Sequence, residues 1–206
     1  MADQRRSSED RQAELTDAAL HIIATQGIAA LTTRSLAARV GLSTGAIFKH
    51  FASLDALLDA VVTRVEEVLD LTYPSPTLSP IARLEQFVDA RSVAVGQQLG
   101  ILRLVLSEQF LLALPMSGSE RLAACVQKTR AFVTECLREA QSASEIRTDL
   151  SAETLAPIVM GAVQMLALSS SKTRANQTQS REVQRALFAL LRVPPQVSEP
   201  KRKSSR

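Results

Sequence analysis

The segment TTRSLAARVGLSTGAIFKHF, residues 32–51, predicts two short helices joined by a tight turn. Thr32 or Thr33 caps the first helix, and Ser43 caps the second. Gly41 supplies the turn residue, and a small alanine in the first helix lets the two helices approach closely. This combination is specific for a helix-turn-helix. An ordinary two-helix corner of a bundle is the alternative interpretation.

The same region is free of negative charge. No acidic residue occurs between Asp17 and Asp55, whereas Arg34, Arg39 and Lys49 lie inside that window. A helical pair of this kind favours contact with phosphates. Because only three side chains supply the positive charge, we expect DNA binding to depend also on helix N-termini and on short side chains, which let the protein backbone approach the DNA closely.

The composition indicates an all-α protein. The chain has 206 residues, of which 46% are hydrophobic, 22% charged and only 3% aromatic, and its net charge is +3. These values exclude a disordered chain and favour helices over strands. The N-terminus lacks an apolar signal core, and no apolar run approaches ~18 residues. We therefore expect a cytoplasmic protein with no membrane contact.

No set of residues predicts catalysis or metal binding. Both histidines, His21 and His50, belong to the helix-turn-helix region. Cys125 and Cys136 lie about three turns apart on one predicted helix, roughly 16 Å, too far for a disulfide, and we interpret them as small apolar residues. No nucleophile–base pair, phosphate loop or spaced Cys/His set occurs. We expect no enzyme, no catalytic residues, no metal and no cofactor.

Helical periodicity predicts about nine helices in two domains. Residues 9–53 form the helix-turn-helix domain, and 54–193 form a larger helical effector-binding and dimerisation domain, of which 54–71 is a connecting helix. A proline-rich linker, TYPSPTLSP, follows that helix. Residues 194–206 are a disordered basic tail. The other predicted helices cover 9–26, 81–99, 101–114, 119–143, 151–170 and 181–193.

The helix around IVMGAVQMLAL, residues 158–168, is apolar on nearly every face. A helix of this kind must be buried all round, which on a small domain predicts a partner subunit. Together with the last helix it can form a four-helix bundle between two copies of the chain; a core helix of a monomer is the alternative. The predicted dimer interface consists of Ile158, Gly161, Ala162, Leu166, Val183, Leu187, Leu190 and Leu191.

The motifs of residues 9–62 resemble the DNA-binding domain of the tetracycline-repressor (TetR) family. The Gly27-Ile28 break, Leu36-Ala37, Val40-Gly41-Leu42-Ser43 and His50-Phe51 carry this resemblance. It implies a homodimer that binds a palindromic double-stranded DNA operator. It also implies a C-terminal pocket for a small molecule, in a part of the chain that matches the family only in architecture.

The DNA-binding residues predicted from this domain differ in chemistry. Arg34 is the strongest candidate for reading a base, because a guanidinium pairs bidentately with guanine. Lys49 and Thr33 are expected to contact phosphates, and His50 either contacts a phosphate or packs at the domain seam. The full prediction comprises Thr33, Arg34, Ser43, Thr44, Gly45, Ala46, Phe48, Lys49 and His50.

Two positions depart from the pattern that the resemblance implies. Phe48 stands where the family usually has a tyrosine, whose hydroxyl commonly reaches a phosphate, and Leu54 stands where a lysine is usual. Both changes remove a contact with the DNA backbone. We therefore predict that binding depends less on salt than is usual. The slope of log affinity against log salt concentration should be smaller by roughly one or two units.

For the ligand pocket, polar side chains on otherwise apolar helices are the candidates, with apolar neighbours as its wall. They are Phe87, Arg91, Arg103, Phe110, Phe132, Gln164 and Met165. We expect a small apolar effector. The sequence thus predicts a ligand-responsive transcriptional regulator, most simply a repressor released from its operator. The alternative is a DNA-binding regulator or architectural protein without an effector, controlled by a protein partner.

Overall fold

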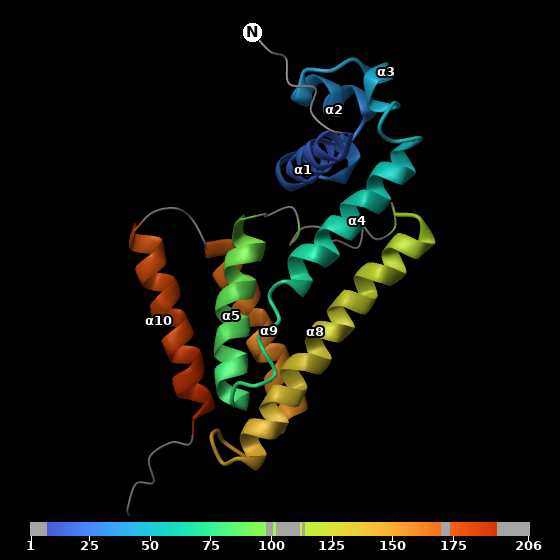
Figure 1. Ribbon diagram of the computed structural model, residues 1–206. Helices are drawn as coiled ribbons and strands as arrows, with labels where there is room; N and C mark the ends of the chain where they lie inside the picture. Colours follow the sequence, from blue (N-terminus) through green and yellow to red (C-terminus); the bar gives the residue numbers. More distant parts are fainter. Residues whose placement is uncertain (1–7, 98–100, 102–111, 113, 170–173, 193–206) are drawn as a thin grey trace, which may run out of the picture.

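The computed structural model describes residues 8–97, 101, 112, 114–169 and 174–192. Within these ranges it contains eight α-helices, one short 3₁₀ helix and no strand, which confirms the all-α prediction (Figure 1). The elements are α1 (Ser8–Gln26), η1 (Ile28–Ala30), α2 (Thr33–Val40), α3 (Thr44–Ile47), α4 (Leu54–Asp70), α5 (Pro80–Gln97), α8 (Met116–Ser142), α9 (Ala152–Ser169) and α10 (Arg174–Leu191).

Helices α1, α2 and α3 form a small unit at one end of the molecule (Figure 1). The expected caps start and stop them. Thr32 accepts a hydrogen bond from the Ser35 backbone N–H, with Ser35 bonding back, and Gly41 ends α2 with φ 70°. Leu15, Leu36, Ile47 and Phe51 are buried in the common core of the unit.

Helix α4 leaves this unit and runs into the second half of the chain (Figure 1). Ser53 caps it through a hydrogen bond from the Ala56 N–H, and Asp55 lies in its first turn, where the helix dipole favours negative charge. Its buried side chains, from Leu57 to Leu69, belong to the same hydrophobic cluster as α1 and α2. The helix-turn-helix and the start of the helical half therefore share one core.

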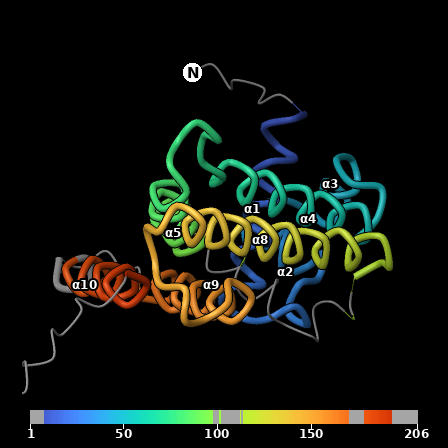
Figure 2. Tube along the Cα trace, turned by 90° about the horizontal axis from the view of Figure 1, so that it is seen from below, coloured from blue at the N-terminus to red at the C-terminus, as the bar shows by residue number. Residues whose placement is uncertain are grey.

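Helices α5, α8 and α9 pack against one another, and α10 lies on the outer side of α9 (Figures 1 and 2). A second hydrophobic cluster, built from Phe87, Val133, Leu155 and Val159 with their neighbours, fills the space between them. Pro80 occupies the first position of α5, and Ser79 caps it.

Two helices begin earlier than predicted. Helix α8 starts at Met116 rather than at residue 119. Its first turn includes Gly118, which lies close to Val62 of α4. Helix α10 starts at Arg174 rather than at residue 181. The prediction missed its first two turns because they are polar and show no apolar periodicity.

Helix α9 is a longer apolar segment than was expected from the sequence. Its 18 residues have a mean hydropathy of 1.4, so that by length and composition alone it could cross a membrane. However, Leu155, Ala156 and Val159 of α9 are buried in the second hydrophobic cluster. Core helices of globular proteins pass the same test, which makes this weak support for a span.

Several predictions lie outside the described residues. They are most of the helix predicted at 101–114, with Arg103 and Phe110, and the basic tail at 194–206.

Candidate DNA-binding surface and ligand cavity

The turn between α2 and α3 is fixed by backbone and side-chain hydrogen bonds. The Leu42 N–H donates to the Ala37 carbonyl at 2.9 Å, and the Ala46 N–H donates to the Ser43 hydroxyl oxygen at 3.2 Å. Ser43 thus orients the first turn of α3 while its own hydroxyl hydrogen stays available. Helix α3 is short, with one α-helical turn before the chain changes direction.

The predicted DNA contacts gather on the outer face of this unit. Arg34, Lys49 and Phe48 are exposed, and no ion pair engages Arg34 or Lys49 within the described part of the chain. The Phe48 side chain is 51% exposed, so that its ring is accessible to a partner at this surface. Of the remaining candidates, Ser43, Thr44 and Gly45 are exposed, and Thr33, Ala46 and His50 are half-buried.

His50 lies where α1 meets the end of α3. Its carbonyl oxygen accepts a hydrogen bond from the Gln12 side chain at 2.8 Å. Its Nδ1 atom is buried and has no hydrogen-bond partner among the described residues. The backbone of His50 therefore has a structural role, and the enclosed Nδ1 favours packing of the ring at the domain seam over a phosphate contact.

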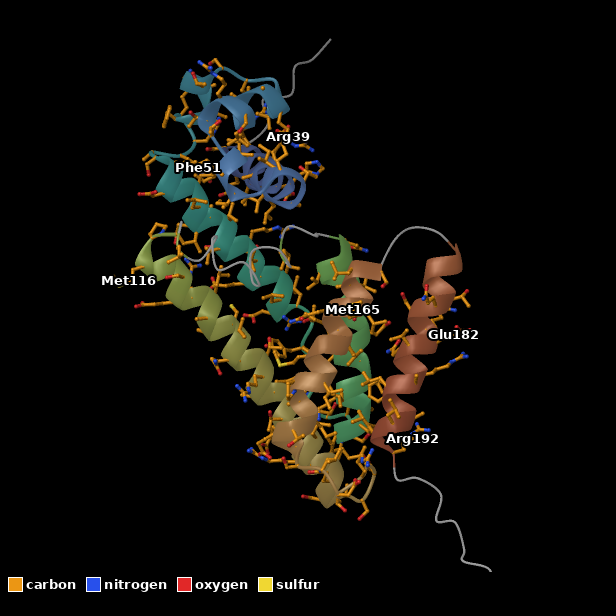
Figure 3. The ribbon with its side chains drawn as sticks, turned by 180° about the vertical axis from the view of Figure 1, so that it is seen from behind. Arg39, Phe51, Met116, Met165, Glu182 and Arg192 are labelled. Carbon is orange, nitrogen blue, oxygen red and sulfur yellow. The ribbon has the colours of Figure 1, made fainter. Side chains whose placement is uncertain are left out.

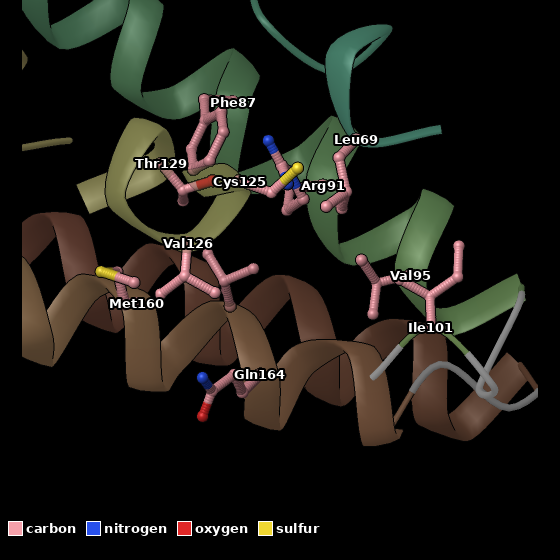
Figure 4. A pocket seen from close by; sticks show the side chains of 11 residues that line it. Leu69, Phe87, Arg91, Val95, Ile101, Cys125, Val126, Thr129, Met160 and Gln164 are labelled. Carbon is pink, nitrogen blue, oxygen red and sulfur yellow. The ribbon is translucent and has the colours of Figure 1, made fainter. Parts of the chain in front are cut away.

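In the helical half, a cavity of about 130 Å³ lies between the two hydrophobic clusters (Figure 4). Leu69 reaches it from the end of α4, Phe87 and Arg91 from α5, and Cys125 and Thr129 from α8. Its wall is mainly apolar. The complete lining is Leu69, Phe87, Arg91, Val95, Ile101, Cys125, Val126, Thr129, Met160, Val163 and Gln164.

Arg91 is the charged group of this lining, and it is only 4% exposed. Its guanidinium carbon lies 4.9 Å from the centre of the Phe87 ring and 5.1 Å from that of Tyr73. Burial lowers the pKa of Arg91, and the nearby Tyr73 and Asp70 act in the opposite direction. Burial also raises the pKa of the Cys125 thiol.

The predicted pocket residues divide into three groups. Phe87, Arg91 and Gln164 line the cavity, and Phe132 packs against Phe87 with ring centres 5.0 Å apart, one layer behind the wall. Met165 is placed differently from the prediction: it is 60% exposed on α9, on the face opposite the cavity lining (Figure 3). The step from Gln164 to Met165 turns a helix by about 100°.

Sequence reasoning missed several lining residues. Cys125, Val126 and Thr129 of α8 recur at helical spacing with Leu122 and Val133, a signal that was available. Tyr73 was missed because it lies in the proline-rich segment that was interpreted only as a linker. Its hydroxyl forms a hydrogen bond with that of Thr129 at 3.1 Å, and its ring contacts Phe87 and Phe132.

Ion pairs join α4 to α8 between the cavity and the helix-turn-helix. Arg121 of α8 donates to Asp59 at 2.7 Å, to Thr63 at 2.8 Å and to Glu66 at 3.0 Å from its Nε atom. One turn further along α4, Lys128 donates to Asp70 at 2.7 Å, and this hydrogen bond raises the pKa of Lys128. A displacement of α8 at the cavity therefore acts directly on α4.

The residues predicted for the dimer interface lie on two different sides of their helices. Leu166, Leu187 and Leu191 are buried within the subunit, so that they are core residues rather than interface residues. By contrast, Ile158 and Leu190 are 54% and 69% exposed. An outer apolar face remains on α9 and α10, made of Ile158, Gly161, Ala162, Met165, Leu168, Val183 and Leu190.

Comparison with known proteins gives a family match in the helix-turn-helix region. Residues 15–61 match the family described as bacterial regulatory proteins, tetR family. The HTH-type transcriptional regulator SrpR of Pseudomonas putida is 25% identical over 196 residues, which is 91% of this chain and 88% of that regulator. BetI of Paraburkholderia phytofirmans, also an HTH-type transcriptional regulator, is 42% identical over 57 residues, 28% of this chain and 29% of its own.

Solved structures show the same fold over nearly the whole chain. The ketosteroid transcriptional regulator KstR2 of Mycobacterium tuberculosis superposes with a TM-score of 0.72 at 19% identity, covering 94% of this chain and 99% of KstR2. AibR in complex with isovaleryl coenzyme A and operator DNA gives a TM-score of 0.73 at 14% identity, covering 90% of this chain and all of AibR (100%). At these identities the likeness concerns the fold.

Proposed function

Because the chain belongs to the TetR family of bacterial regulatory proteins, and is thus a DNA-binding transcriptional regulator rather than an enzyme, we propose how it is controlled. It acts in the cytoplasm as a homodimeric repressor on a palindromic operator. A small molecule in the cavity between α4, α5, α8 and α9 releases it from DNA. AibR, which shares the fold, has been solved in complex with isovaleryl coenzyme A and operator DNA, and this supports a ligand-responsive role.

The continuity of α4 is the observation that carries this proposal. At its N-terminus α4 shares a core with the helix-turn-helix, and at its C-terminus Leu69 forms part of the cavity wall. One helix, with no break between Leu54 and Asp70, therefore touches both sites. Packed elements move as rigid units, so that a ligand which shifts α4 also moves α2 and α3.

The outer apolar face of α9 and α10 is the proposed contact between subunits. Isolated exposed leucines are ordinary, but here exposed apolar residues recur at helical spacing along two adjacent helices. A two-fold dimer would place two copies of α3 about one DNA turn apart, roughly 34 Å, and would match a palindrome. Ligand-induced movement of α4 changes that spacing, and a difference of about 1–3 kcal/mol between the two states is enough for control.

The experiment has two steps. First, operator-like sequences are selected from randomised duplexes, and metabolites are screened for raising the melting temperature of the full chain. Second, the affinity for the selected duplex is measured by fluorescence anisotropy with each hit. We expect a weakening of about 5- to 150-fold with a true effector.

The matched control is Val126→Phe, which fills the cavity from α8 without touching the helix-turn-helix. We expect this variant to bind DNA normally and to lose the response to the ligand. A ligand that binds in the cavity and leaves the DNA affinity unchanged would contradict the proposal and favour control by a protein partner.

Phe48→Tyr is expected to be a gain-of-function change. The exposed ring already lies beside the predicted DNA contacts, and the added hydroxyl can reach a phosphate. One further hydrogen bond per subunit is worth about 0.5–1.5 kcal/mol, so that the affinity of the dimer should rise about 5- to 150-fold. Anisotropy titrations at several salt concentrations give both the affinity and the slope.

The salt dependence of the wild-type protein tests whether Phe48 and Leu54 reduce its contacts with the DNA backbone. The quantity measured is the slope of log affinity against log salt concentration. We expect it to correspond to fewer than about six phosphates per dimer. A larger slope, or no change on introducing the tyrosine, would mean that residue 48 does not lie at the backbone.

A further inference from the structure

The guanidinium of Arg91 is a buried positive charge without a carboxylate partner in the described part of the chain. Its Nε and Nη2 atoms are enclosed, and neither has a hydrogen-bond partner there. Arginine stays protonated in proteins, so that these two nitrogen atoms belong to a group with a full positive charge. A buried unpaired charge is strongly unfavourable, and its persistence calls for a ligand or a function.

Other arginines in the same half of the molecule do have acidic partners. Arg83, which lies eight residues before Arg91 on α5, pairs with Glu139, and Arg121 pairs with Asp59 and Glu66. The acidic residue near Arg91 is Asp70, which already accepts a hydrogen bond from the Lys128 Nζ atom at 2.7 Å. Among the described residues, Arg91 is thus compensated by the rings of Phe87 and Tyr73, by a side-chain hydrogen bond with Tyr73 and by the charge of Asp70, which Lys128 shares, but by no carboxylate of its own.

The rings hold Arg91 in a defined position at the cavity. It lies against Phe87 and Tyr73, and Tyr73 is fixed in turn by its hydrogen bond with Thr129. Cation–π contacts of this kind orient a guanidinium without using its N–H donors. In Figure 4 the nitrogen atoms of Arg91 lie among Phe87, Cys125 and Leu69, the residues that line the cavity with it.

We propose that the cavity binds a small organic carboxylate whose head group pairs with the Nε and Nη2 atoms of Arg91. This pair of donors forms one edge of the guanidinium, the geometry that receives a carboxylate through two parallel hydrogen bonds. The inference rests on the proposed function, since it names the chemical class of the effector, and it adds a carboxylate to the small apolar effector that the sequence predicts.

The volume limits the body of this ligand. A cavity of about 150 Å³ accommodates benzene, and the cavity here is about 130 Å³. The apolar part therefore contains about six non-hydrogen atoms. Val95, Val126, Met160 and Val163 supply its apolar surroundings.

The test compares acids with neutral molecules of the same shape. Isothermal titration of the full chain uses hexanoate against 1-hexanol and benzoate against benzyl alcohol, with acetate-to-decanoate as a length series. We expect the best acid to bind about ten- to a hundredfold more tightly than its alcohol, because hydrogen bonds to a charged group are stronger than neutral ones.

Arg91→Met removes the charge and keeps the volume approximately. We expect it to abolish the preference for the acid and to leave the melting temperature of the unliganded protein unchanged or higher, because an uncompensated charge has been removed from the interior. Arg91→Lys keeps the charge without the planar donor edge and should retain only part of the preference. Arg130→Met, at an exposed position of α8, is the control with the same charge change and should behave as the wild type.

Three results would overturn this inference: an alcohol that binds as well as its acid, an unchanged preference in Arg91→Met, or no binding by any acid of the series. Operator affinity is measured in parallel and separates the two proposals. An acid that binds through Arg91 without weakening DNA binding leaves this inference intact and contradicts the proposed function. A neutral ligand that releases DNA supports the proposed function and contradicts this inference.

Discussion

Replacement of Gly45 by leucine is expected to abolish operator binding while the fold and the dimer remain intact. Gly45 is exposed in the first turn of α3, and an added Cβ atom would meet nothing within 4 Å. Its backbone needs no positive φ, so that leucine is tolerated there and is a better helix former than glycine. On DNA, the same side chain would hold the start of α3 away from the groove.

We expect the affinity for the selected duplex to fall at least about a hundredfold, because close approach of the helix is needed for every base contact. The melting temperature should not fall. Ala123→Leu adds similar bulk at an exposed position of α8 and should leave DNA binding unchanged. Normal binding by Gly45→Leu would show that α3 does not enter the groove at this point.

The double substitution Ile158→Glu with Met165→Glu is expected to convert the dimer into monomers. Both side chains belong to the outer apolar face of α9, and both are more than half exposed in the single subunit. In a dimer they would be buried against their counterparts, and four carboxylates in one apolar interface would cost several kcal/mol. Because a monomer reads only half of a palindrome, operator affinity should fall at least about a hundredfold.

Sedimentation velocity measures the mass, and circular dichroism checks that the helices persist. The control is Leu71→Glu, a change at a leucine directly after α4 that is 84% exposed and does not belong to the outer apolar face of α9 and α10. It should leave a dimer with normal DNA affinity. A double variant that stays dimeric would place the interface elsewhere.

The local signals in the sequence were strong enough to predict the DNA-binding end of the molecule. Caps at Thr32 and Ser43 and breaks at Gly27 and Gly41 all occur where they were expected. Each depends on one or two residues and their immediate neighbours, so that no tertiary information is required.

The cavity depends on contacts between distant segments, and only part of it could be predicted. Polar residues on apolar helices drew attention to Arg91 and Gln164, but one residue further along α9 the same reasoning placed Met165 in the wall, where it is exposed. Nothing local indicates that Tyr73, from a proline-rich segment, packs between Phe87 and Phe132.

The apolar helix α9 illustrates why burial and pairing need the structure. Its pattern correctly suggests more apolar surface than one subunit covers. The sequence does not say which residues face the core, so that Leu166 was assigned to the interface although it is buried within the subunit. Ile158, Met165 and Leu168 form the face left open.

The central claim, that one continuous α4 couples the cavity to the DNA-binding surface, is tested most directly by reciprocal linkage. The affinity of the full chain for the tightest carboxylate is measured by calorimetry, first alone and then with saturating operator duplex. Coupled sites must affect each other equally, so that we predict the operator to weaken carboxylate binding by the same factor, about 5- to 150-fold, by which the carboxylate weakens operator binding. Identical carboxylate affinities with and without DNA would contradict the coupling.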